Sequence, residues 1–154
     1  MIPSADDHRF LALALAQAQQ AADAGEVPVG AVVVCDGDVV ASAQNRMVRD
    51  REATAHAEVL ALREAMRVVG DARLDACTLY VSLEPCAMCA GAIVLARVGR
   101  VVFSAWDDKA GMAGSVGDLL RHPRLNHRPQ VLGGVDAEPS TALLRTFFAA
   151  QRRP

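Results

Sequence analysis

The sequence predicts an α/β fold of three layers (α/β/α), in which helices cover both faces of a mixed five-stranded sheet. Two observations lead to this prediction. An aspartate-glycine pair joins two apolar runs early in the chain, which is typical of an antiparallel hairpin. After that hairpin, strand-like and helix-like segments alternate to the end of the chain, and this alternation favours crossover connections between parallel strands.

The chain is expected to open with an amphipathic helix followed by the hairpin. Residues 7–24 are predicted to form the helix, because Leu11, Leu15, Ala18 and Ala22 fall on one helical face. Gly25 is expected to end it. Residues 29–35 and 39–43 are predicted to be antiparallel strands joined by Asp36-Gly37.

The rest of the chain is expected to alternate between helix and strand. A helix is predicted over 55–69 with Thr54 as its N-terminal cap, and a strand over 78–83. Pro85 suits the first turn of a helix that runs to about residue 98. The remaining predictions are a strand over 100–104, a short helix near 116–121, a strand over 130–134 and a last helix that carries Leu143, Leu144, Phe147 and Phe148.

Length and composition indicate one globular domain over residues 1–154. The 154 residues are 52% hydrophobic and 22% charged, and the net charge of −2 selects no partner by itself. No apolar run approaches the roughly 20 residues that span a bilayer, and no basic stretch precedes an apolar one at the start. We therefore expect a cytoplasmic protein without a secretory signal, in which four cysteines favour metal binding or catalysis more than disulfides.

Two helix starts carry the residues with chemical potential. His56-Ala57-Glu58 opens one helix, and Cys86 and Cys89 lie three residues apart at the start of another. The exposed backbone N–H groups of a helix N-terminus favour thiolates. One imidazole and two thiolates are a plausible set of ligands for zinc (Zn²⁺), and three protein ligands leave the fourth tetrahedral position open, which is typical of a catalytic site.

Glu58 is the candidate catalytic residue. It lies two residues from His56, near the metal without needing to bind it. Hydrolytic deamination requires activated water and a group that moves its proton to the departing ammonia. Zinc lowers the pKa of bound water to around 7, and a carboxylate beside it can carry protons in both directions. The arrangement H-x-E followed by P-C-x-x-C is a recognised signature of zinc deaminases.

The residues alone leave other interpretations open. A C-x-x-C pair that follows a strand and begins a helix also fits a thioredoxin-like redox site. The His-x-Glu motif on the adjacent helix start argues against that interpretation. A closed structural zinc site with Cys35 or Cys77 as the fourth ligand is a second rival, but both cysteines fall on predicted strands, where free cysteine is often simply buried.

Five segments resemble the bacterial tRNA-specific adenosine deaminases (TadA family) of the cytidine deaminase superfamily. They are GEVPVGAVVV (25–34), TAHAE (54–58), LYVSLEPCAMCAGAI (79–93), GRVVFSAWDDKAGMAGS (99–115) and LNHR (125–128), in the order of the family. The zinc motif is shared with cytidine, guanine and riboflavin-pathway deaminases. The segments over 107–115 and 126–128 favour the tRNA branch.

The resemblance implies a cytidine deaminase-like fold, one zinc ion per chain, a homodimer, and conversion of the wobble adenosine of a tRNA anticodon to inosine. It also implies roles in substrate binding. Asn45 would hydrogen-bond the target nucleotide and Val29 would contact the purine. Glu84, Pro85 and Cys86 would form the wall of the base site. Asp107, Lys109 and Asn126 would line the RNA groove.

Two other functions use the same motifs. A free-base or nucleoside deaminase acting on guanine or cytosine would keep the zinc centre without an RNA groove. A catalytically silent zinc protein that binds RNA would keep the ligands, although Glu58 argues against it. Three arginine clusters (121–128, 46–51 and 152–153) suit either phosphate contacts or solvated loops.

The chain also departs from the family pattern. It lacks an aspartate-proline pair before Thr54, and Ser104 replaces a common glycine. Trp106 adds a large aromatic side chain next to Asp107, and an exposed tryptophan there would offer a stacking surface for a base.

Overall fold

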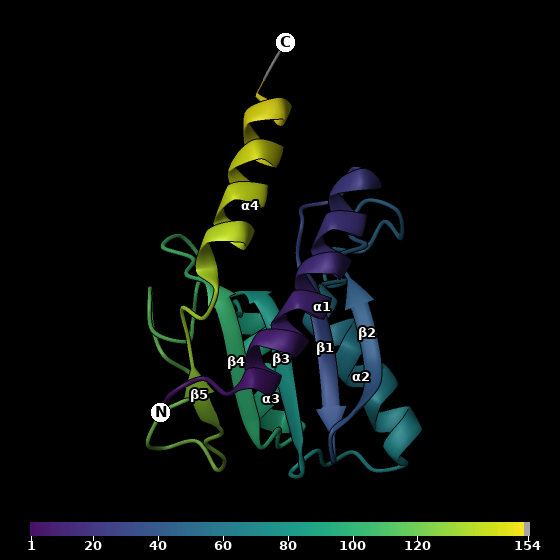
Figure 1. The fold of residues 1–154 in the computed structure, drawn as a ribbon. Helices are drawn as coiled ribbons and strands as arrows, with labels where there is room; N and C mark the ends of the chain where they lie inside the picture. The colour runs from purple at the N-terminus through teal and green to yellow at the C-terminus, as the bar shows by residue number, and fades with distance from the viewer. Residues whose placement is uncertain (153–154) are drawn as a thin grey trace.

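The computed structural model describes residues 1–152 as a five-stranded mixed sheet flanked by helices, which confirms the predicted fold class (Figure 1). The elements are α1 (Ala5–Asp23), β1 (Gly30–Cys35), β2 (Asp38–Gln44), α2 (Ala57–Val69), β3 (Cys77–Leu83), α3 (Ala87–Leu95), β4 (Arg100–Ala105), β5 (Gln130–Leu132) and α4 (Ala137–Gln151). The strand order is β2-β1-β3-β4-β5. Strand β1 is antiparallel to both of its neighbours, whereas β3, β4 and β5 are parallel.

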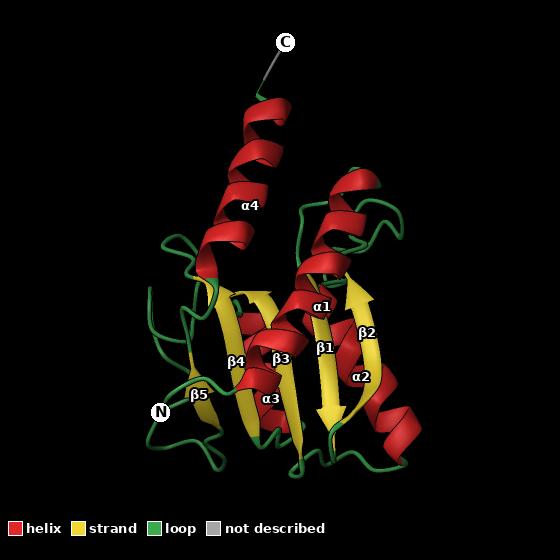
Figure 2. Cartoon of the chain, viewed as in Figure 1, coloured by secondary structure: helices red, strands yellow, loops and turns green. Residues whose placement is uncertain are grey.

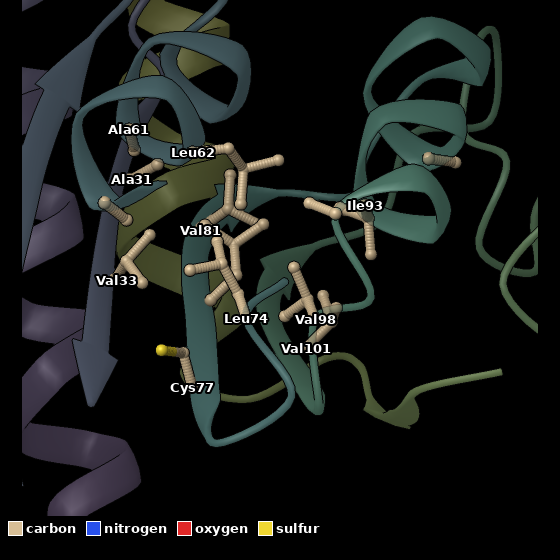
Figure 3. Close-up of a cluster of buried hydrophobic side chains, with 14 of the residues drawn as sticks. Ala31, Val33, Ala61, Leu62, Leu74, Cys77, Val81, Ile93, Val98 and Val101 are labelled. Atoms are coloured by element: carbon tan, nitrogen blue, oxygen red, sulfur yellow. The ribbon is translucent and has the colours of Figure 1, made fainter. Parts of the chain in front are cut away.

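Helices α1 and α4 lie on one side of the sheet, and α2 and α3 lie on the other (Figure 2). The two faces have separate hydrophobic cores. Alternate residues of β1 supply them, since Ala31 and Val33 face α2 and α3 while Val32 and Val34 face α1. Figure 3 shows the larger core, where Leu62 of α2 and Ile93 of α3 pack toward Val81 and Val101 of the sheet. No helix among the described residues is long and apolar enough to span a membrane.

The direction of the strands determines where a site can form. Strands β2 and β3 are both antiparallel to β1, and β4 is parallel to β3. The carboxyl ends of β2, β3 and β4 therefore lie along the same edge of the sheet, the one formed by strand ends. Helix α2 follows β2 and helix α3 follows β3, so both helices begin at that edge. Two helix N-termini and three loops therefore converge there, as is usual for ligand sites in α/β folds.

Asp7 anchors α1 to the sheet. Its buried carboxylate accepts hydrogen bonds from the Tyr80 hydroxyl at 2.8 Å and from the Arg100 guanidinium at 2.6 and 2.8 Å. It also completes a capping box with Ser4 at the helix start. The hydrogen bond from Arg100 holds the pKa of Asp7 far below its usual range, against the opposing effect of burial. One carboxylate thus joins a helix start to two strands.

The predicted short helix near 116–121 is wrong. The segment forms turns, with an isolated bridge between Ala113 and Asp118, because its backbone N–H groups bond to loop carbonyls and to the side chain of Asp118. Strand β5 ends at Leu132, two residues before its predicted end. Thr54 does not cap α2: His56 occupies the cap position, and the Thr54 hydroxyl donates to Glu52 at 3.0 Å.

The structure also contains a disulfide, which the sequence did not favour. Cys35 and Cys77 are paired residues on adjacent antiparallel strands β1 and β3, with their Cα atoms 4.4 Å apart, and they are joined by a disulfide. Cys77 is buried, as predicted, while Cys35 is only half-buried. The disulfide removes both cysteines from any set of zinc ligands, so the closed four-ligand site is excluded in this state.

Candidate active site

The structure brings His56, Cys86 and Cys89 together from two helix starts. His56 is the N-cap residue of α2 and Cys86 is the N-cap residue of α3, while Cys89 lies in the first turn of α3. The Nδ1 atom of His56 lies 3.6 Å from the Sγ atom of Cys86 and 3.5 Å from that of Cys89. All three candidate ligand atoms lie within 4.8 Å of one another.

These distances fit a zinc ion. Zinc bonds to imidazole nitrogen at about 2.0 Å and to thiolate sulfur at about 2.3 Å, so a tetrahedral site separates the two atoms by about 3.5 Å. The Nδ1–Sγ distances match that separation. No other group of three histidine, cysteine or acidic side chains in the described part of the chain is arranged in this way. His56, Cys86 and Cys89 would therefore hold zinc and leave one position open.

Charge is already separated among the three side chains. A hydrogen bond from the Cys89 thiol, followed by one from His56, lowers the pKa of Cys86 to about 3. The hydrogen bond between His56 and Cys86 raises the pKa of His56. The hydrogen bond between Cys89 and Cys86, together with burial, raises the pKa of Cys89. Cys86 is thus a thiolate in the protein alone, and a bound dication would also ionise Cys89.

Glu58 lies in the first turn of α2 and is only 4% exposed. Burial raises the pKa of its carboxyl to about 7. It lines the same small pocket as His56 and Cys86. A carboxyl with a pKa near neutrality, beside a metal site, is suited to both accepting and donating a proton.

The pocket beside these residues has a volume of about 180 Å³, and we call it the site pocket. It is lined by Val27, Val29, Asn45, Met47, His56, Ala57, Glu58, Leu83, Glu84, Cys86, Asp107 and Ala110. Val29 and Asn45, for which the sequence indicated contacts to a base, therefore both face it. A cavity that is mostly apolar and has a few convergent polar groups is typical of a small-molecule or base site.

Asn45 is held in a fixed orientation. Its Nδ2 donates to the carbonyl of Val27 at 3.3 Å, and its Oδ1 accepts from the backbone N–H of Met47 at 3.2 Å. A carboxamide has two donor hydrogens and two acceptor lone pairs, so each end keeps capacity for one more bond. The side chain can thus contact a ligand in the site pocket without rearrangement.

The side chain of Glu84 makes contacts that the sequence did not indicate. Its buried carboxylate accepts hydrogen bonds from the backbone N–H groups of Asp107, Ala113 and Ser115 at 3.0, 3.0 and 2.9 Å, and from the Ser115 hydroxyl at 2.5 Å. A side chain at Gly111 would place its Cβ 2.3 Å from this carboxylate. Glu84 reaches the edge of the site pocket, but its carboxylate is used to fix the loop over residues 107–115.

A second buried carboxylate fixes the loop on the other side. Glu26 accepts from the backbone N–H groups of Val48 and Arg49 at 3.0 and 2.8 Å, and from the Arg49 side chain at 3.1 Å. Arg46 pairs with Asp50 at 3.1 Å. Two arginines of the 46–51 cluster therefore hold this loop together, which accounts for their presence without phosphate contacts.

The remaining predicted substrate residues are spread more widely. Asp107 lines the site pocket, and its carboxylate accepts from the backbone N–H groups of Lys109 and Ala110. Lys109 does not line the site pocket. Pro85 is buried and does not line the site pocket, but its carbonyl accepts from the N–H of Met112.

The segment around Asn126 lies away from the site pocket. It directly precedes β5, and Gln130 pairs with Arg100 at the amino end of β4, opposite the edge where α2 and α3 begin. His127 bonds to the carbonyl of Val98, and Arg128 to those of Pro123 and Leu125. Within one chain, the structure does not bring Asn126 to the candidate site, because β4 separates the two.

Helix α4 is the element that the sequence did not connect to the site. Beside the site pocket lies a groove of about 810 Å³, lined by residues that include Trp106, Lys109, Arg145, Phe148 and Arg152, and we call it the α4 groove. It shares Val27, Leu83, Asp107 and Ala110 with the site pocket. The sequence showed only that this helix carries Leu143, Leu144, Phe147 and Phe148. The structure adds that Ser140 is the only buried residue of α4, so these apolar side chains are not fully covered.

Known proteins share this fold and these motifs. The family profile of the cytidine and deoxycytidylate deaminase zinc-binding region matches residues 4–105. The tRNA-specific adenosine deaminase of Bacillus subtilis (strain 168) is 44% identical over 147 residues, which cover 96% of this chain and 91% of the relative.

Two solved structures extend the comparison. The structure of a tRNA:A34 deaminase that performs A-to-I editing at the wobble position has a TM-score of 0.86 and 41% identity, covering 89% of this chain and 99% of that one. The guanine deaminase of Nitrosomonas europaea has a TM-score of 0.77 and 28% identity, covering 97% of this chain and 87% of that one.

Proposed function

The chain belongs to the cytidine and deoxycytidylate deaminase family, and within it to the tRNA-specific adenosine deaminases, and on this basis we propose that it converts the wobble adenosine of a tRNA anticodon to inosine. The observation that carries the proposal is the 44% identity to a tRNA-specific adenosine deaminase along 96% of this chain. We propose that residues 1–154 act as one zinc-dependent deaminase domain and that the protein works in the cytoplasm, which a tRNA substrate supports.

The proposed mechanism assigns separate tasks to the ligands and to Glu58. His56, Cys86 and Cys89 would hold zinc, which would supply Lewis-acid activation of water when bound. Glu58 accepts a proton as that water attacks the purine ring carbon that bears the amino group. It delivers that proton to the ring nitrogen, then takes the proton of the added hydroxyl group and delivers it to the amino group, which leaves as ammonia. A pKa near 7 suits both directions of transfer.

The site pocket accounts for how one base would be bound. Its volume of about 180 Å³ admits a single base and not a stacked pair. Val29 supplies an apolar contact and Asn45 supplies the remaining hydrogen-bonding capacity of its amide. A base inside a helix cannot reach such a pocket, so the target adenosine must leave its stack, at lower cost from a loop than from a duplex.

The homodimer that the resemblance implies is supported by α3. This helix has no charged residue, and apolar or small side chains surround it on every side. Its outer face consists of Ala87, Met88, Gly91, Ala92 and Leu95, and Leu95 is 85% exposed. A helix that is apolar all round is ordinarily buried, and an exposed apolar face marks an interface. A second copy of the chain is the proposed occupant of this face.

A direct assay separates the candidate functions. Purified, zinc-loaded protein is incubated with a tRNA anticodon stem-loop that contains a wobble adenosine, with the same strand annealed to its complement, and with free adenosine, guanine and cytosine. We expect ammonia release and inosine formation from the stem-loop, with much slower reaction of the duplex and of the free compounds. Equal rates on free adenosine and the stem-loop would contradict the tRNA proposal.

The other outcomes identify the alternatives. Release of ammonia from guanine without dependence on salt would assign the chain to the free-base deaminases, which is the function named for the similar Nitrosomonas europaea protein. For an RNA substrate, KM should instead rise steeply with salt, because phosphate contacts release counterions. Zinc content without ammonia release from any substrate would indicate an RNA-binding protein that lacks catalysis.

A further inference from the structure

The site pocket holds one base, so the nucleotides on either side of the target need another surface. The α4 groove shares the lining residues Val27, Leu83, Asp107 and Ala110 with the site pocket. Its volume of about 810 Å³ is several times larger than that of the site pocket. A strand that enters the pocket would therefore continue into this groove.

The groove combines exposed aromatic rings with positive charge. Trp106 is 51% exposed and Phe148 is 43% exposed, although both are large apolar side chains. Lys109, Arg145 and Arg152 line the groove beside them, against the carboxylates of Asp107 and Asp108. Aromatic faces interleaved with cationic side chains suit single-stranded nucleic acid, because bases stack on the rings and phosphates meet the cations.

Trp106 is held rigidly on the side that faces the protein. Its indole makes an edge-to-face contact with Phe103, with ring centroids 4.9 Å apart at 90°. It packs directly on Gly114 and Gly134: a Cβ at these positions would lie 3.2 Å and 2.8 Å from the indole. Both glycines also have positive φ angles, which other residues rarely adopt. The indole is thus fixed in place before any ligand arrives.

We propose that Trp106 is a specificity-determining residue on which the base of a nucleotide adjacent to the target adenosine stacks. This inference rests on the proposed function, and it concerns how the RNA is positioned and not the chemical step. A stacked neighbour would pull the target base out of the loop toward Glu58. The contribution is expected in KM, because Trp106 does not touch the reacting atoms.

Substitution with a matched control tests the residue. Replacing the indole with an aliphatic side chain, Trp106→Leu, should raise KM for the stem-loop about 5- to 100-fold, which corresponds to the loss of one stacked base, and leave kcat within about twofold. Trp106→Phe should recover most of the loss. Val69→Ala, which truncates a 43% exposed side chain at the far end of α2, should leave KM unchanged. Zinc content and thermal midpoint are measured for each variant to verify folding.

An abasic scan identifies the stacked nucleotide and guards against a folding artefact. Stem-loops that each lack one base beside the target are assayed with both proteins. With the parent protein, KM should rise when the base that stacks on Trp106 is the missing one. With Trp106→Leu, removal of that base should raise KM little further, because the same contact is already lost. Since Trp106 is the single tryptophan of the chain, its fluorescence should be quenched by the intact stem-loop and not by that abasic one.

The outcomes separate the inference from the proposed function. If the parent protein forms no inosine from the stem-loop, the proposed function fails first. If it forms inosine but KM changes less than twofold in Trp106→Leu, the stacking role is overturned. The role is also overturned if the increase in KM from the abasic stem-loop and the increase from Trp106→Leu multiply when the two changes are combined. Quenching that persists with every abasic stem-loop would also overturn it.

Discussion

Glu58 is buried almost completely, yet it lies beside a site that must admit water and a base. The burial that raises its pKa also leaves it without bulk solvent as a competing proton donor. The side chain is therefore placed to exchange protons with the substrate and with activated water, and this arrangement leads to a prediction about its chemistry.

We expect Glu58→Gln to lose turnover and keep its structure. An amide has nearly the same shape as the carboxyl but cannot accept the proton, and general acid–base groups typically contribute 10²- to 10⁴-fold to the rate. Single-turnover inosine formation measures the loss, while zinc content and stem-loop binding serve as controls. Activity within about tenfold of the parent protein would remove Glu58 from the mechanism.

At the level of elements, buried carboxylates hold the structure around the site. Glu26 fixes the loop after β2, Glu84 fixes the loop after β4, and Asp7 fixes the start of α1. Hydrogen bonds from backbone, hydroxyl or guanidinium donors outweigh the effect of burial in each case, and all three pKa values lie below the usual range. These anchors ionise in the folded protein and are stabilising where carboxylates are charged.

Asp7→Asn should destabilise the protein in a pH-dependent way. Hydrogen bonds to a charged group are worth about 2 kcal/mol, so the free energy of unfolding at pH 7 should fall by roughly that amount. The pKa of Asp7 is lowered on folding from about 3.9 in the unfolded chain, so its stabilisation is complete above that value and is lost as the pH falls toward the folded pKa.

Urea unfolding at pH 7 and pH 3 measures this effect. The difference between the parent protein and Asp7→Asn should be about 1 kcal/mol smaller at pH 3, since the unfolded Asp7 is then largely protonated. Other carboxylates titrate in both proteins and cancel. An equal difference at the two pH values would show that the charge of Asp7 does not matter.

The elements also show what can be predicted from one sequence. The hairpin and the alternation of helices and strands follow from local spacing. The meeting of His56 with Cys86 and Cys89 could also be predicted, because each motif lies at the start of a helix that comes after a strand in the chain. The pairing of Cys35 with Cys77 could not be predicted from local spacing, because it depends on the register of two strands whose cysteines are 42 residues apart in the chain. The anchoring role of Glu84 depends similarly on a distant, irregular loop.

At the level of the whole molecule, two faces remain open in the single chain. The α4 groove is proposed to bind RNA, and the outer face of α3 is proposed to bind a second copy. The Asn126 segment lies far from the site pocket of its own chain, so a role for it in substrate binding requires the site of another copy. The sequence could indicate this residue but not which subunit it serves.

Leu95→Glu should separate the proposed dimer. A charge at this 85% exposed position costs little in the monomer, but it would be buried without a partner at a subunit interface. Analytical ultracentrifugation at micromolar concentration should show twice the chain mass for the parent protein and the chain mass for the variant. Val69→Glu, on an exposed position of α2, is the control. A parent protein that sediments as a monomer would contradict the proposal.

The positions of His56 and Cys86 as N-caps of α2 and α3 have a thermodynamic consequence. An ion bound at two helix starts favours the folded chain by mass action, by about 2.7 kcal/mol at a free concentration one hundred times the dissociation constant. Chelation should therefore lower the thermal midpoint by roughly 5–10 °C, and added zinc should restore it. Cys89→Ser should abolish most of this response, whereas Glu58→Gln should retain it. An unchanged midpoint would mean that the ion contributes only to chemistry. A lowered midpoint would mean that the lifetime of the folded enzyme depends on the supply of zinc.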